Sequence, residues 1–379
     1  MYRLFIVFVF LLVLPGLTAC DGADQSSDGN DTKESVTPGE SAEANEPTAG
    51  EDSNAFGEPG SVLREGAAQI DDGRHVEPGA FSYIPPEGWN IETMPGMRYK
   101  LAMGPEINGE TANINVVEER YPGPIDDYVE ASLNSIEVML QEFELDHRGS
   151  ITTDTGEVSP WLEFRHLQFG QTYRQRMYFF AAADNMYYLM TCTIHSVHHD
   201  KDVFFPRCDN AAKSFRAGDA GPAPDASRRG FITDEGRFKI PELVSYEVPE
   251  GWVADEAPGS EYLATFAPEH DGFRSNLVVV KEDSELDLEE YTRVSYRELI
   301  DELGVDIIDD PAPLTTASGV EGRRLEFTHD VFHIPLRQVF YVYDGGPYYV
   351  LLVCSAHDSQ AELMLPTCDA AAKTVQIDS

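Results

Sequence analysis

A short segment near the middle of the chain carries the residues best suited to bind a metal ion. Within six positions it holds three histidines and one aspartate, namely His195, His198, His199 and Asp200. Zinc and copper accept imidazole and carboxylate ligands, so one alternative is a metal-binding protein or a metal-dependent enzyme that uses this group. The comparable segment later in the chain has only His357 and Asp358. We therefore expect a solvated loop before the last helix rather than a metal site.

The cysteines indicate cross-links rather than redox chemistry. Apart from Cys20, they stand at equivalent places as Cys192 with Cys208 and Cys354 with Cys368. Three pairings are possible, and the equivalence favours one disulfide in each group, as is common in exported proteins. The spacings of 16 and 14 positions differ and no C-x-x-C pair occurs. Both facts disfavour the alternative of a redox or metal site.

Other residue patterns give little support for catalysis. Glu163 and Glu326 each precede a histidine, His166 or His329, by three positions. On an alternating strand such residues point to opposite faces and cannot form an acid–base pair. The chain has no Gly-x-Ser-x-Gly, phosphate-binding glycine loop or His-Glu-x-x-His motif. We predict a protein without catalytic residues and without a cofactor.

The elements that must carry these residues occur twice. The motif Pro-Glu-Gly-Trp ends at Trp89 and again at Trp252, 163 positions later. The same offset relates further pairs: Asn113 and Asn276, Tyr128 and Tyr291, His166 and His329. We therefore predict two copies of one domain, residues 71–216 and residues 234–379, with a linker at 217–233. Both tryptophans follow a glycine at a strand exit, and we expect them to pack in the core or at its rim.

Within one copy the apolar periodicity predicts an α+β domain. Residues 125–143 form an amphipathic helix with Asp126 and Asp127 in its first turn, where the helix dipole favours acids. The other predicted elements are strands at 79–84, 98–103, 113–118, 150–153, 161–168, 173–182 and 186–194, and a last helix at about 204–215, with a helix start at Pro206. Residues 306–310 predict a strand edge with a solvated face. Each copy should be a mostly antiparallel sheet packed with helices.

This order of elements resembles a known family. A strand leading into Pro-x-Gly-Trp, a hairpin, one long helix, an antiparallel sheet and a closing helix are similar to the PsbP-like and DcrB-like domains. The resemblance covers each copy nearly whole. It implies a PsbP-like fold and a role in binding or assembly, and it implies no active residues, because Pro-x-Gly-Trp marks a turn.

The start of the chain resembles a bacterial lipoprotein signal. Residues 1–19 hold Arg3 and an apolar run too short for a membrane span, and they end in Leu-Thr-Ala before Cys20. The resemblance implies cleavage before Cys20 and its modification by acyl chains such as palmitate, which hold a protein to a membrane leaflet. The alternative is a plain signal peptide followed by a coincidental cysteine.

Residues 20–70 predict a flexible acidic tether, because they contain almost no aromatic residues and cannot bury enough apolar surface to fold. The whole chain has 67 Asp and Glu against 27 Lys and Arg, a formal net charge of −40. Such a charge argues against nucleic acid as a partner. It suits a basic protein, or it reflects adaptation to a salty habitat.

The combined prediction is a cell-envelope lipoprotein on the periplasmic or surface side of a membrane leaflet. It would contact the membrane through its N-terminal lipid and bind or help assemble an envelope protein. A passive acidic surface component without a specific partner is a further alternative.

Overall fold

The computed structural model describes residues 73–168, 170–218, 226–270, 273–303, 305–331 and 334–378. The predicted signal peptide, Cys20 and the tether lie outside the described residues, as does the middle of the linker. The domain limits therefore stay predictions, and "first repeat" and "second repeat" below denote the two segments related by the offset of 163. In the described part of the chain, no helix is long and apolar enough to cross a membrane.

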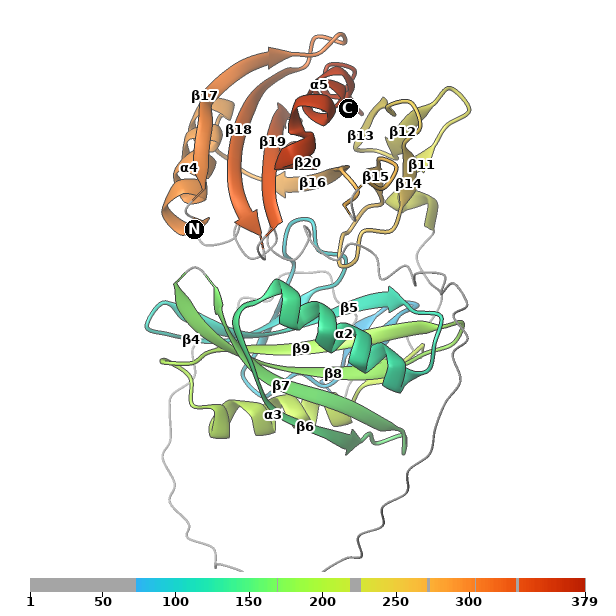
Figure 1. Cartoon of the computed structure of the whole chain (residues 1–379), viewed down its shortest axis with the longest axis vertical. Helices are drawn as coiled ribbons and strands as arrows, with labels where there is room; N and C mark the ends of the chain where they lie inside the picture. The colour runs from blue at the N-terminus through green and yellow to red at the C-terminus, as the bar shows by residue number, and fades with distance from the viewer. Residues whose placement is uncertain are drawn as a thin grey trace, which may run out of the picture. The chain divides into compact units, whose positions relative to one another are not determined.

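A seven-stranded antiparallel sheet forms the centre of the first repeat, in the order β3-β4-β5-β9-β8-β7-β6. Its strands are β3 (Asn90–Glu92), β4 (Leu101–Ile107), β5 (Glu110–Arg120), β6 (Gln141–Thr152), β7 (Val158–Gln168), β8 (Gln171–Ala181) and β9 (Met186–His195). Helix α2 (Ile125–Met139) joins β5 to β6, and α3 (Lys201–Lys213) follows β9 (Figure 1). Asp126 and Asp127 lie in the first turn of α2, as predicted.

The second repeat has the same sheet, in the order β14-β15-β16-β20-β19-β18-β17. Its strands are β14 (Val253–Asp255), β15 (Ala264–Phe266), β16 (Asn276–Asp283), β17 (Asp306–Thr315), β18 (Glu321–Val331), β19 (Ile334–Asp344) and β20 (Tyr348–His357). Helix α4 (Leu288–Leu303) precedes β17, and α5 (Ala361–Ala372) follows β20 and the short η2 (Asp358–Gln360). The predicted α+β class with mostly antiparallel sheets is confirmed.

Each repeat also has a small sheet, and in the first repeat one of its strands is the one predicted at residues 79–84. In the first repeat it orders β1 (His75–Glu77), β2 (Phe81–Tyr83) and β10 (Arg216–Ala217); in the second it orders β11 (Phe231–Ile232), β12 (Arg237–Ile240), β13 (Val244–Glu247) and β21 (Gln376–Ile377). A short helix, η1 (Ala226–Arg229), precedes β11. Arg216 pairs with Ser82 across more than 130 residues. Local periodicity carries no information about a pairing between such distant segments.

Helix α2 ends earlier than predicted, at Met139 instead of residue 143. Leu140 already has an extended conformation, and β6 begins at Gln141 rather than at residue 150. The apolar side chains of Phe143 and Leu145 pack on the same cluster as the helix. Because they lie two positions apart, a strand buries both on one face, and this packing overrides the helical pattern of the sequence.

Helix α3 begins earlier than predicted. It starts at Lys201, so that Pro206 lies inside the helix rather than at its start, and Pro366 likewise lies inside α5. The predicted start at the Pro-x-Cys-Asp motif is therefore wrong. The side chain of Asp200 accepts a hydrogen bond from the backbone N–H of Asp202. This N-cap stabilises a helix start at Lys201, upstream of Pro206.

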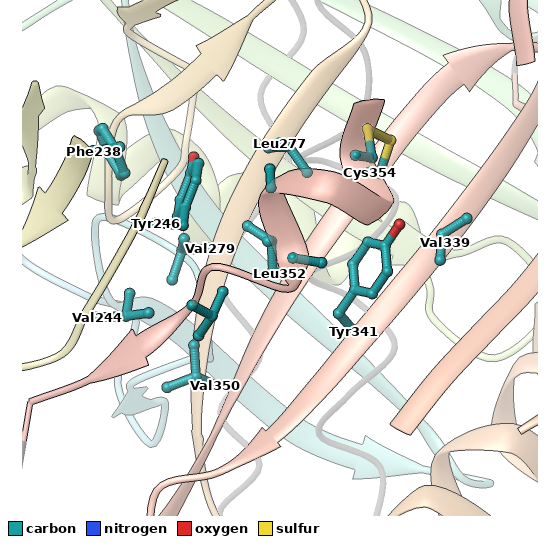
Figure 2. Packing of buried hydrophobic residues seen from close by; sticks show 14 of the residues in the cluster. Phe238, Val244, Tyr246, Leu277, Val279, Val339, Tyr341, Val350, Leu352 and Cys354 are labelled. Atoms are coloured by element: carbon teal, nitrogen blue, oxygen red, sulfur yellow. A yellow bond between two sulfur atoms is a disulfide. The ribbon is translucent and has the colours of Figure 1, made fainter. Parts of the chain in front are cut away.

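The two faces of each sheet support separate cores. In the second repeat, Leu277 and Val279 of β16 pack on the α5 side with Tyr246, Tyr341 and Leu352 (Figure 2). The alternate residues, Val278 and Val280, pack on the α4 side. Trp89 and Trp252 are buried, with 7% and 8% exposed, which confirms their predicted place in the core.

Candidate functional site

The histidine segment is more buried than expected. His195 closes β9 and is only 6% exposed, and His199 is 4% exposed. The prediction of a solvated loop is therefore wrong for these two side chains. The ring of His195 stacks on that of His198 with centroids 4.5 Å apart, and the Nδ1 of His199 accepts a hydrogen bond from the backbone N–H of His195. Burial lowers the pKa of both His195 and His199.

These contacts give the segment a structural role. Asp200 caps α3, and His199 packs edge-on against Phe204 of the same helix. Across the described ranges of the chain, no group of three or more His, Cys, Asp or Glu has the geometry to hold a metal ion. The four side chains thus join the end of β9 to the start of α3.

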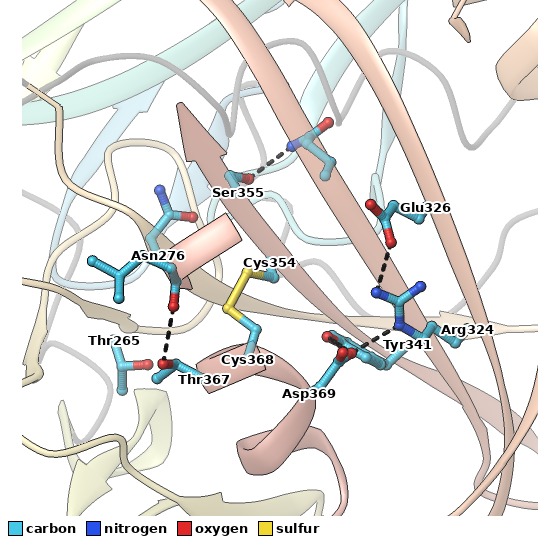
Figure 3. The surroundings of a disulfide bond; sticks show 12 residues. Thr265, Asn276, Arg324, Glu326, Tyr341, Cys354, Ser355, Thr367, Cys368 and Asp369 are labelled. Atoms are coloured by element: carbon cyan, nitrogen blue, oxygen red, sulfur yellow. Dashed lines mark hydrogen bonds and ion pairs between the residues drawn. A yellow bond between two sulfur atoms is a disulfide. The ribbon is translucent and has the colours of Figure 1, made fainter. Parts of the chain in front are cut away.

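The predicted disulfides are present. Cys192 of β9 is bonded to Cys208 of α3, and Cys354 of β20 is bonded to Cys368 of α5, with Cα atoms 6.2 Å apart in both pairs. All four cysteines are fully buried. Figure 3 shows the second disulfide between the sheet and the helix. Each bond therefore fixes the last helix of a repeat to the central strand before it.

A network of charged residues lies beside the first disulfide. Glu163 of β7, which is 1% exposed, faces Arg176 of β8 directly across the strand pair. Arg176 bonds to both oxygens of the Asp209 carboxylate in α3, at 2.8 and 3.0 Å, and its Nε lies 3.2 Å from Glu163. The hydroxyl of Tyr178 donates to Asp209 at 2.6 Å. The guanidinium also stacks on Trp161, 4.5 Å from the ring centroid.

The second repeat builds the same network with an arginine from another strand. Arg324 of β18 bonds to Glu326 at 2.7 Å and to Asp369 of α5 at 2.8 Å (Figure 3). The hydroxyl of Tyr341 donates to Asp369 at 2.6 Å. Arg324 stands 163 positions after Trp161, so the arginine replaces the aromatic side chain on which Arg176 stacks.

The networks are suited to hold charge rather than to transfer protons. Burial lowers the pKa of Arg176, but its hydrogen bonds to Glu163 and Asp209 outweigh this effect and the net shift is upward. The sequence patterns do not predict these networks, although the Cys-Asp that recurs in both last helices marks one of their residues.

Pairs of a half-buried glutamate and a buried tyrosine lie on the opposite face of each sheet. The hydroxyl of Tyr128 in α2 donates to Glu119 of β5, and the hydroxyl of Tyr291 in α4 donates to Glu282 of β16. Burial raises the pKa of both Glu119 and Glu282 to about 7. Each pair therefore links the first long helix of its repeat to the sheet through a carboxyl group that is partly protonated at neutral pH.

The recurring histidines lie on this same face. The ring of His166 packs 6.1 Å from that of Phe164, a member of the core under α2, whereas Glu163 points to the α3 side. The prediction that Glu163 and His166 point to opposite faces is confirmed. Burial lowers the pKa of His166 to about 4. In the second repeat, His329 lies 2.7 Å from Gln338, which in turn donates to Ser355.

Comparisons with known proteins give no match to a family model and none to a curated protein. Among solved structures, the chain is similar to LpqN, involved in cell envelope biogenesis of Mycobacterium tuberculosis, with 16% identity and a TM-score of 0.31 over 36% of this chain and 83% of that one. It is also similar to the cyanobacterial PsbP (CyanoP) from Synechocystis sp. PCC 6803, with 18% identity and a TM-score of 0.28 over 42% and 98% of the two chains.

A longer match is the type VI secretion immunity protein TplEi from Pseudomonas aeruginosa. It has 12% identity and a TM-score of 0.23, over 77% of this chain and 97% of that one. A PsbP protein is thus among the similar structures. At these TM-scores the function of the chain must be argued from its own residues.

Proposed function

We propose that this protein is a membrane-anchored lipoprotein of the bacterial cell envelope with a non-enzymatic role in binding or assembly. Residues 1–19 direct export, Cys20 carries the lipid, and residues 20–70 hold the two repeats away from the membrane surface. The repeats bind a protein of the envelope.

The cysteine pairing carries this proposal. Of five cysteines, four form two disulfides within the folded repeats. Disulfides persist in oxidising compartments outside the cytoplasm. Cys20 is the remaining cysteine, and it follows Leu-Thr-Ala at the end of the apolar run. Cys20, the residue proposed to carry the lipid, is thus the one cysteine that forms neither of these two disulfides.

The surroundings of the buried acids favour binding over catalysis. Glu163 and Glu326 are held by arginines, and Glu119 and Glu282 accept hydrogen bonds from tyrosines in the helices. Each of these interactions joins one secondary-structure element to another. Groups that fix the scaffold in this way are unsuited to change partners during a reaction cycle.

The charge of the chain indicates the kind of partner. A net charge of −40 creates a negative potential that repels nucleic acid and attracts basic protein surfaces. We therefore propose a partner that is basic where it contacts the repeats.

The experiment compares the native chain with Cys20→Ser in membrane fractions after chemical crosslinking in the cell. The native chain should sediment with membranes and carry acyl chains by mass spectrometry, and it should crosslink reproducibly to a basic envelope protein. Cys20→Ser should lose the acyl mass and leave the membrane fraction. Acylation that persists in Cys20→Ser would refute the anchor, and a native chain that captures no specific protein would refute the binding role.

A further inference from the structure

The two seven-stranded sheets end in edge strands that differ between the repeats. Strands β6 and β17 are the last strands in their sheet orders, and Figure 1 shows each at the margin of its sheet. From residue 148 to residue 152, β6 pairs with β7 without a register shift, and its side chains are exposed or half-buried. An edge strand offers unpaired backbone groups to any further strand.

The second repeat blocks its edge with proline. Pro313 of β17 lies opposite Arg323 of β18. A proline in an edge strand must direct its nitrogen away from the neighbouring strand, because it has no N–H to donate. Pro311 lies in the same strand, and Asp309 and Asp310 add exposed negative charge. These residues are typical of edges that avoid pairing with another chain.

The first repeat keeps its donor at the same place. Ser150 stands 163 positions before Pro313, and it lies opposite Pro160, which stands 163 positions before Arg323. Because Ser150 has the same register on β7 as Pro313 has on β18, its N–H points away from β7, as the nitrogen of Pro313 points away from β18. Pro160 gives a second reason for this direction. In a hydrogen-bonded antiparallel pair each residue donates its N–H to the other, and Pro160 has no N–H. Ser150 and Pro160 therefore form a non-hydrogen-bonded pair, in which the N–H of Ser150 points away from β7. The N–H groups of Arg148 and Thr152, two residues away, point in the same outward direction.

The side chains beside this edge differ between its two faces. On the α3 side, the ring of Trp161 covers Gly149, where a Cβ atom would come within 2.4 Å of the indole, and Ile151 packs on the same core. On the α2 side, Arg148 forms an ion pair with Glu130, whose side chain is 56% exposed. One face next to the edge is thus apolar, and the other is polar, with the exposed Glu130 held by Arg148.

The geometry points to the edge of β6 from residue 148 to residue 152 as a docking site for an extended segment of another protein that alternates apolar and basic residues. The segment adds a strand to the sheet through the outward groups of Arg148, Ser150 and Thr152. Its apolar residues lie beside Gly149 and Ile151. Its basic residues lie on the side of Glu130.

The net charge decides between this partner and a second copy of the chain. Two copies that joined their β6 edges would bring together two molecules of charge −40, and their mutual repulsion opposes that contact. A basic segment is attracted instead. This inference rests on the proposed binding role, which it makes specific to one strand.

The test uses two peptides of about nine residues, the length of a long strand, one alternating Val and Lys and the other alternating Val and Glu. Hydrogen exchange of the mature chain, read by mass spectrometry, should show rapid exchange of the outward N–H groups of Arg148, Ser150 and Thr152. The Val/Lys peptide should slow this exchange by about tenfold or more, and the Val/Glu peptide should not. Ser150→Pro, which copies the second repeat, should weaken binding of the Val/Lys peptide by about tenfold or more.

Pro313→Ser is the matched control and should leave peptide binding at residues 148–152 unchanged. Circular dichroism and intact disulfides check that both variants fold. The inference is overturned if the Val/Lys peptide gives no protection, if Ser150→Pro binds it as tightly as the native chain, or if the free chain is already protected there as a dimer. If one of these results is obtained but crosslinking still captures an envelope protein, the proposed binding role stands and only the docking site on β6 is refuted.

Discussion

The guanidinium of Arg176 lies directly across a strand pair from the buried carboxylate of Glu163, and it extends from there to Asp209 in the last helix. One side chain thus connects two strands and a helix beside a disulfide. In the second repeat the same connection starts from Arg324, two positions before Glu326 on a single strand. Arginines from two different strand positions thus make the same pair of contacts, one with a glutamate of the sheet and one with an aspartate of the last helix. This recurrence indicates that the fold requires a cation between these two carboxylates.

Arg176→Met should lower the free energy of unfolding by about 3 kcal/mol, because it leaves a buried carboxylate without its main partner. Denaturant unfolding followed by tryptophan fluorescence is the measurement, since Trp161 lies against Arg176. Arg293→Met is the control. It removes an ion pair whose side chains are both more than 40% exposed, so the change should stay within about 0.5 kcal/mol. Equal losses in the two variants would contradict the role of Arg176.

Glu119→Gln should change how stability depends on pH. The pKa of Glu119 is raised to about 7 in the folded chain from an ordinary value of 4.5, so the folded state holds the proton more tightly. The stabilisation is present below about pH 4.5 and is lost as the pH rises through about 7. Gln cannot ionise and still accepts the hydrogen bond from Tyr128. The variant should therefore gain about 2 kcal/mol relative to the native chain between pH 5 and pH 8.

Urea unfolding at several pH values measures this difference. Glu282→Gln should behave like Glu119→Gln, because its carboxyl group has the same raised pKa. Glu106→Gln changes an exposed residue and should follow the native profile. A Glu119→Gln curve parallel to the native one would show that Glu119 is ionised throughout.

Asp200 offers a test of the histidine segment. As the N-cap of α3 it accepts a hydrogen bond from Asp202, so Asp200→Ala should cost about 1 kcal/mol, whereas Asp200→Ser should cost little because serine also caps helices. Thermal unfolding compares the variants with and without added zinc. If Asp200 were instead a metal ligand, zinc would raise the melting temperature of the native chain, and both Asp200→Ala and Asp200→Ser would lose this increase.

The disulfides predict a simple labelling result. In the Cys20→Ser chain, a thiol reagent should label no cysteine before reduction and four afterwards. Peptide mapping should link Cys192 to Cys208 and Cys354 to Cys368. Replacing Cys192 and Cys208 together by alanine should lower stability by about 3 kcal/mol, the value expected for a loop of this length. A peptide that linked Cys192 to Cys368 would refute the pairing.

Residue patterns alone predict the repeat and the local elements of the fold. The offset of 163 follows from the similarity of two distant segments of the sequence, whereas the amphipathic helix that begins at Ile125 and the alternating strands follow from short-range patterns. The disulfide partners followed from the equivalence of the cysteines. The helix and the strands are predictable because these elements impose periods of a few residues on the sequence.

Features that depend on contacts between distant residues appear only in the folded chain. The small sheets pair strands from both ends of a repeat, and helix α2 ends early because Phe143 and Leu145 pack better in a strand. The Glu163–Arg176 contact and the outward N–H of Ser150 depend on the register between strands. Register is set by the packing of whole faces and by long-range pairing, so no local pattern in the sequence contains it.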